Sequence, residues 1–158
     1  MKAIKNAKIL VLVGMTGSGK SAAVDYLANK GYPKVHSDGT TQQTIDEIHR
    51  LVSSGQRHII LDGLNSWTEY KVLKHEFPGE TTVLAITPPK ALRYKHLSTR
   101  LEHPLTEQEA NACDYSEIEN LEKSGPIAAA DYYITNTKSL DELNKSVDHL
   151  LQEISFFE

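Results

Sequence analysis

Two kinds of apolar segment alternate along this chain of 158 residues. Short runs of consecutive apolar residues, each bounded by glycine, proline or polar residues, are typical of strands buried on both faces. The strands predicted in this way are residues 9–13, 33–38, 58–62, 81–87 and 131–135. Because helical segments separate them, the pattern predicts an α/β fold in three layers, with a five-stranded parallel sheet between two layers of helices.

The predicted helices have apolar residues every three or four positions and recognisable ends. They cover residues 21–30, 41–54, 66–76, 90–101, 106–123 and a final segment from residue 139 onward. Thr106-x-x-Glu109 and Ser139-x-x-Glu142 read as capping boxes, and Gly125-Pro126 is expected to end the fifth helix. The expected buried positions are Trp67, Tyr70 and Leu73 in the third helix and Leu140, Leu143, Val147, Leu150, Leu151 and Ile154 in the last. The stripe on the last helix suits a surface that covers the sheet, and a dimerisation face is the alternative.

One loop between the first strand and the first helix matches the pattern G-x-x-x-x-G-K-[ST]. It consists of Gly14, Met15, Thr16, Gly17, Ser18, Gly19, Lys20 and Ser21. Glycines let the backbone N–H groups surround a phosphate closely, and the following helix N-terminus adds a partial positive charge. Lys20 is then expected to reach the β and γ phosphates, and the Ser21 hydroxyl to ligate Mg²⁺. A bare glycine-rich turn requires neither of these two side chains.

Two aspartates follow predicted strands, at the edge where α/β sheets bind ligands. Asp62 ends the strand 58–62, and we interpret it as an acidic residue that orients Mg²⁺ or its water shell. Asp38 ends the strand 33–38 and is a candidate base for an attacking hydroxyl, although an acceptor phosphate needs no base. Each aspartate precedes a glycine, so ordinary turn chemistry remains the alternative for both.

A basic helix near residues 90–101 is the best source of cations for a lid over the γ-phosphate. Arg93 and Arg100 are seven positions apart, or about two helical turns, and are expected on one helix face. The region of about 93–110 therefore reads as a lid, with a solvated helix face as the alternative. The seven histidines show no metal-ligand spacing.

The composition limits the classes of partner. The net charge of −4 and a pI near 6.0 argue against nucleic acid or an anionic membrane as the main partner. The single cysteine, Cys113, suits a reducing compartment and reads as a half-buried small residue. With no apolar run of membrane-spanning length and no signal-peptide core at residues 1–6, we expect one cytoplasmic domain over residues 1–158.

These motifs together resemble the nucleoside-monophosphate kinase class of P-loop proteins, most closely dephospho-CoA kinase and its adenylate-kinase-like relatives. The resemblance rests on the phosphate loop, residues 60–63, Arg93-x6-Arg100, residues 103–110, and residues 130–136 with 139–143. It implies ATP and Mg²⁺ as cofactors and a small-molecule phosphate acceptor as partner. It also implies that residues 136–138, beginning with Asn136, lie near the adenine.

Some features depart from that class. Only one helix fits between Asp38 and the strand at His58, where such kinases carry an acceptor-binding insert, and Asn65 and Cys113 stand where related proteins often have arginine. An ATP-dependent kinase is the leading hypothesis, with a non-catalytic ATP-binding module as the alternative. A GTPase switch is disfavoured because residues 136–141, Asn-Thr-Lys-Ser-Leu-Asp, do not match the guanine-reading Asn-Lys-x-Asp motif. Either a monomer or a homodimer fits the pattern.

Overall fold

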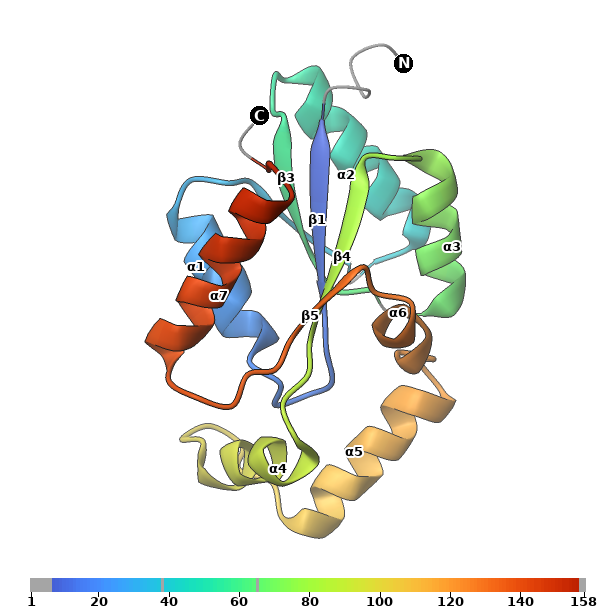
Figure 1. Ribbon diagram of the computed structural model, residues 1–158. Coiled ribbons are helices and arrows are strands. Elements are labelled where there is room, and N and C mark those ends of the chain that lie inside the picture. The colour runs from blue at the N-terminus through green and yellow to red at the C-terminus, as the bar shows by residue number, and fades with distance from the viewer. Residues whose placement is uncertain (1–6, 38, 65, 157–158) are drawn as a thin grey trace.

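A computed structural model describes residues 7–37, 39–64 and 66–156 of the chain. Its centre is a five-stranded parallel sheet in the order β2-β3-β1-β4-β5, which confirms the predicted sheet (Figure 1). The strands are β1 (Lys8–Val13), β2 (Lys34–His36), β3 (His58–Asp62), β4 (Thr81–Ile86) and β5 (Tyr132–Ile134). The strand with the phosphate loop therefore lies in the middle of the sheet.

Helices cover both faces of the sheet. The helices are α1 (Lys20–Asn29), α2 (Thr41–Ser53), α3 (Trp67–Glu76), α4 (Lys90–Thr99), α5 (Glu107–Glu119), α6 (Ser124–Ala128) and α7 (Leu140–Glu153). In β1, Ile9, Val11 and Val13 pack into a cluster with α2 and α3 residues, whereas Leu10 and Leu12 pack with α1 and α7 residues. This alternation explains why a central strand is apolar at every position and confirms the three-layer architecture.

Helices α4 and α5 lie apart from these two layers, beyond the carboxyl ends of the strands (Figure 1). They contact one another and extend from β4. Parallel α/β sheets bind their ligands at this edge, so the two helices stand where a cover over the phosphate loop is expected. Among the described helices, none is both long and apolar enough to cross a membrane.

Several local predictions are corrected by the structure. The fifth helix ends at Glu119, and Gly125-Pro126 lies within α6, because proline is tolerated in the first turn of a helix. Position 125 also requires glycine, because a Cβ atom there would lie 2.7 Å from the Trp67 ring. At α7, Ser139 accepts a hydrogen bond from the Glu142 N–H at 3.3 Å, which is one half of the predicted capping box.

Two predicted apolar stripes are also only partly right. In α3, Leu73 is buried, but Trp67 and Tyr70 are half-buried and stack on each other with ring centres 4.9 Å apart. The buried polar residue of that helix is Glu69, which accepts a hydrogen bond from Ser37. In α7, Leu140 is exposed because it is the first residue of the helix, before the stripe turns toward the sheet. Both outcomes reflect tertiary contacts that the helical period alone does not contain.

Candidate functional site

The phosphate loop connects the carboxyl end of β1 to the N-terminus of α1. Gly17 and Gly19 have φ angles of 85° and 95°, values that residues with a side chain rarely adopt. Neighbouring segments also approach these glycines closely: a Cβ atom on Gly17 would lie 2.8 Å from Leu97, and one on Gly19 would lie 2.4 Å from Asn136. The loop is therefore packed between α4 and the β5–α7 connection.

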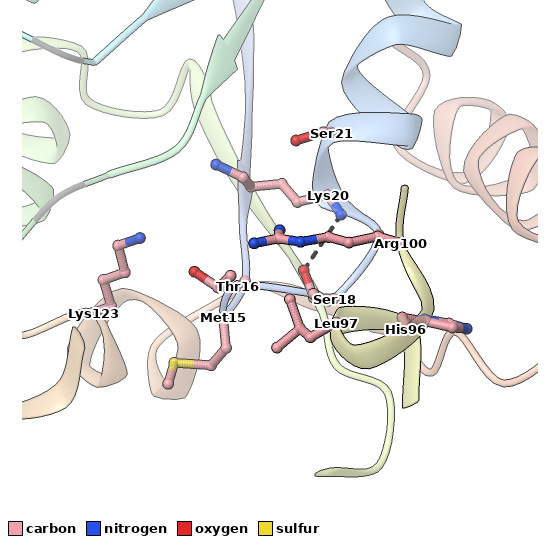
Figure 2. A pocket seen from close by; sticks show the side chains of 12 residues that line it. Met15, Thr16, Ser18, Lys20, Ser21, His96, Leu97, Arg100 and Lys123 are labelled. Atoms are coloured by element: carbon pink, nitrogen blue, oxygen red, sulfur yellow. Dashed lines mark hydrogen bonds between the residues drawn. The ribbon is translucent and has the colours of Figure 1, made fainter. Parts of the chain in front are cut away.

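A cavity of about 410 Å³ opens over this loop (Figure 2). It is lined by all eight loop residues, Gly14, Met15, Thr16, Gly17, Ser18, Gly19, Lys20 and Ser21, and by His96, Leu97, Arg100 and Lys123. The loop side chains, the α4 end and the segment before α6 thus face a common space. Its volume lies in the range typical of small-molecule sites.

Lys20 and Asp62 form an ion pair beside the phosphate loop, with 3.0 Å between Nζ and Oδ1. The register of β2 and β3 pairs His36 with Asp62, and the His36 Nδ1 atom lies 3.1 Å from Asp62 Oδ2. Parallel pairing of β1 with β3 brings the loop lysine beside the strand-end aspartate. The loop lysine and the strand-end aspartate therefore meet at one edge of the sheet.

The chemistry of Asp62 and Ser21 fits a Mg²⁺ ion. Within the described residues, the Asp62 Oδ1 atom is buried and accepts no hydrogen bond of good geometry, although it lies close to Lys20. No group of three or more His, Cys, Asp or Glu side chains in the described ranges is arranged to hold a metal. Mg²⁺ needs no such cage, because it is commonly bound by one or two protein oxygens together with substrate phosphates and water.

Arg93 does not line the cavity, contrary to the expectation that it faces the phosphates with Arg100. Its guanidinium forms two hydrogen bonds with Asp114 of α5, at 2.9 and 2.8 Å, and donates a third to the Thr16 carbonyl at 3.0 Å. Arg93 and Asp114 are only 7% and 6% exposed. The guanidinium therefore joins α4 and α5 to the phosphate loop.

The electrostatics of this pair agree with its geometry. The hydrogen bond to Asp114 raises the pKa of Arg93 above its ordinary value. Burial raises the pKa of Asp114, but hydrogen bonds from Arg93 and Tyr94 outweigh that effect and leave the Asp114 pKa below its usual value. Both groups are thus charged at neutral pH.

Arg100 lines the cavity but does not share a helix face with Arg93. Helix α4 ends at Thr99, and Arg100 has extended backbone angles of −66° and 149°. Its side chain is exposed and its Nε atom donates a hydrogen bond to the His103 carbonyl at 2.9 Å. The seven-residue spacing failed as a guide because the helix stops one residue too early.

The sequence analysis missed three charged residues near the phosphate loop, because no motif contains them. They are Asp114, Glu117 and Lys123. Glu117 is 3% exposed and accepts a hydrogen bond from the Thr16 N–H at 3.0 Å, while Lys123 Nζ lies 2.5 Å from its other oxygen. Burial raises the pKa of Glu117, but the bonds from Lys123 and Thr16 leave it below its ordinary value. The spacing of Asp114 and Glu117 on one face of α5 was the only available signal.

The remaining predicted site residues are placed as follows. The Asn136 side-chain amide donates a hydrogen bond to the Ser18 carbonyl at 3.1 Å, so the β5–α7 connection contacts the phosphate loop. A small cavity of about 170 Å³ lies along that connection, lined by residues that include Asn136 and Lys138. The candidate base Asp38 and the noted residue Asn65 lie outside the described residues. Cys113 is half-buried, and its sulfur lies 3.8 Å from Glu117.

Comparison with known sequences finds relatives that align over nearly their whole length. A UPF0200 protein of Thermococcus kodakarensis is 26% identical in an alignment that covers 92% of this chain and 97% of the relative. A UPF0200 protein of Sulfurisphaera tokodaii is 25% identical, with 93% and 97% covered. No family model matches the chain.

Comparison with solved structures places the fold. A sugar kinase from Janibacter is 16% identical with a TM-score of 0.67, and 95% of each chain is covered. Shikimate kinase from Acinetobacter baumannii, in complex with shikimate, is 17% identical with a TM-score of 0.60, covering 97% of this chain and 96% of that one. A gluconokinase from Sinorhizobium meliloti is 15% identical with a TM-score of 0.59, covering 97% and 98%. The chain thus has the P-loop fold of the nucleoside-monophosphate kinase class, which includes small-molecule kinases.

Proposed function

We propose that this protein transfers the γ-phosphoryl group of ATP to a small metabolite in a Mg²⁺-dependent reaction. The observation that supports this most is the complete phosphate loop under an open cavity, with Lys20 lying 3.0 Å from Asp62 and Arg100 at the rim. The fold of small-molecule kinases supports the same conclusion. A bare glycine-rich turn would have no need of either the lysine or the half-buried aspartate.

Each residue of the site has a role in this proposal. The loop N–H groups and Lys20 bind the β and γ phosphates, and Asn136 keeps its segment against the loop near the base of the nucleotide. Ser21 and Asp62 would hold Mg²⁺, which neutralises charge that develops on the transferring group. Arg100 closes over the phosphates, and Asp38 remains our candidate for the base that accepts a proton from an acceptor hydroxyl.

A second candidate function is a nucleotide-binding module without turnover. Its support is the connection between β2 and β3, where α2 (Thr41–Ser53) is the one described helix and no larger acceptor-binding insert is present. In addition, Arg50 is paired with Glu47, and Arg57 donates to the Val52 and Gln56 carbonyls. Both arginines bond within their own connection, and Arg57 directly precedes β3, at the edge of the sheet opposite the phosphate loop.

The test is ATP consumption with Mg²⁺ across a panel of nucleoside monophosphates, dephospho-CoA, shikimate, gluconate and simple sugars. One acceptor should stimulate turnover, and Lys20→Ala should reduce it by at least about 10²-fold, because it removes a donor to the charge of the transition state. The matched control is Lys74→Ala, which also loses an ion pair, with 3.3 Å between Lys74 and Asp131, but outside the cavity. Equal activity of the Lys20→Ala variant and the wild type would refute the proposal, and tight ATP binding without stimulation would favour the module.

A further inference from the structure

Lys123 and Lys20 both line the cavity over the phosphate loop. The two lysines also line, with Gly63 and Leu64, a narrow crevice of about 10 Å³ that is too small for a ligand. In Figure 2 the amino ends of Lys20 and Lys123 both lie on the side of the site away from His96. Since Gly63 directly follows β3, this is the β3 side of the loop, whereas Asn136 approaches from the β5 side.

The position of Lys123 is held by both its backbone and its side chain. Its N–H donates to the Glu117 carbonyl at 3.0 Å, and its Nζ atom lies 2.5 Å from the Glu117 carboxylate. The preceding residue, Glu122, has a φ angle of 51°, which is rare for a residue with a side chain. The chain therefore makes a tight turn between α5 and α6 that points this lysine back at the loop.

Helix α6 is anchored in turn to the body of the domain. The Trp67 ring packs against Gly125, where no side chain fits, and Tyr70 donates a hydrogen bond to the Ala129 carbonyl at 3.4 Å. These contacts join the segment after Lys123 to α3. The segment that carries Lys123 is therefore held by packing against α3, whereas the segment that carries Arg100 is exposed.

Negatively charged side chains lie close to Thr16, although a loop that binds phosphate is expected to have positive surroundings. Two buried carboxylates, Asp114 and Glu117, stand directly behind the loop, and each is neutralised by one cation. Arg93 is 7% exposed and directs three hydrogen bonds to Asp114 and the Thr16 carbonyl, so it does not face the cavity. Lys123 is only partly buried, with 21% of its side chain exposed, and its ammonium group carries three donors. It is able to bond Glu117 and an incoming anion together.

We propose that Lys123 is a second lysine for the γ-phosphate, facing Lys20 across it and shielding the phosphate from the charge of Glu117. The inference rests on the proposed binding of ATP. Lys123 lies outside the phosphate-loop motif, so the motif does not identify it. Lys123 would thus fill the part expected of Arg93, which is committed to Asp114. In this arrangement the γ-phosphate of a triphosphate would lie between the two lysines, and a diphosphate would leave that position empty.

The experiment compares Mg-ATP and Mg-ADP dissociation constants by calorimetry, because their ratio isolates the γ-phosphate without requiring an acceptor. Lys123→Met alone would leave a buried carboxylate unpaired, so the informative variant is Lys123→Met/Glu117→Gln, which removes both charges. The expected result is about a 10- to 100-fold loss of ATP affinity, as for a lost charged hydrogen bond, with a much smaller loss for ADP. The conservative variant Lys123→Arg keeps a cation beside Glu117 and should keep most of the wild-type affinity for ATP.

A matched control is Lys74→Met/Asp131→Asn, a partly exposed ion pair away from the cavity, which should leave both constants unchanged. Melting temperatures establish that each variant is folded. An ATP-to-ADP ratio in the Lys123→Met/Glu117→Gln variant equal to that of the wild type would overturn the role of Lys123 while leaving ATP binding in place. Failure of the wild type to bind either nucleotide would overturn the proposed function itself, and this inference with it.

Discussion

Replacing Arg93 with methionine should destabilise the protein strongly, because it strands a buried carboxylate. The change removes two hydrogen bonds to Asp114 and one to the Thr16 carbonyl, and it leaves Asp114 with the Tyr94 hydroxyl at 3.0 Å and no cation bonded to it. Breaking a buried ion pair from one side typically costs about 3–5 kcal/mol. At about 2–4 °C per kcal/mol for a domain of this size, the melting temperature should fall by about 6–20 °C.

The assay is thermal and urea unfolding of a double-mutant cycle. Asp114→Asn alone should also destabilise the protein, since it leaves the Arg93 cation buried. The double variant Arg93→Met/Asp114→Asn should be more stable than the sum of the two single losses predicts, by about 0.5–3 kcal/mol, as for residues in direct contact. A melting temperature of Arg93→Met within about 2 °C of the wild type would refute the reasoning. A loss of phosphoryl transfer without loss of stability would return Arg93 to the role of a phosphate ligand.

Three further results follow from the same contacts. The pKa of Glu117 is lower in the folded protein than in the unfolded chain, where it is near 4.5. The ionised Glu117 therefore stabilises the fold above that unfolded value, and this contribution is lost as the pH falls through the folded value. The stability of Glu117→Gln should consequently depend less on pH in acid unfolding experiments over this range. Asn136→Ala removes the hydrogen bond to the Ser18 carbonyl and should weaken ATP binding by about 3- to 10-fold in titrations, with an unchanged affinity arguing against this contact. Gly17→Val should abolish ATP binding, because it adds a side chain 2.8 Å from Leu97 at a φ angle of 85°; full binding by this variant would show that the loop adapts.

The sheet and the phosphate loop were predictable because their signals are local. Runs such as Ile9 to Val13 are apolar at every position, and a strand with that pattern fits only between two layers of helices. The placement of Lys20 and Asp62 at the same edge of the sheet was predictable, because parallel strands bring their carboxyl ends together there. These inferences require no knowledge of distant contacts.

The charged groups behind the loop were not predictable in the same way. A basic helix gives no indication that Arg93 turns inward to Asp114, since the two are 21 positions apart and each alone is typical of a solvent-exposed face. The sequence pattern predicts Lys123 at the end of the fifth helix, which instead stops at Glu119. Its place in the site depends on the turn at Glu122 and on the packing of Gly125 against Trp67.

The binding of Mg-ATP, with turnover measured against the acceptor panel, tests the central claim most directly. The wild-type protein should bind Mg-ATP and consume it faster in the presence of one acceptor, and Lys20→Ala should do neither while melting as a folded protein. Absence of Mg-ATP binding by the wild-type protein, or equal binding and turnover by Lys20→Ala, would contradict the account.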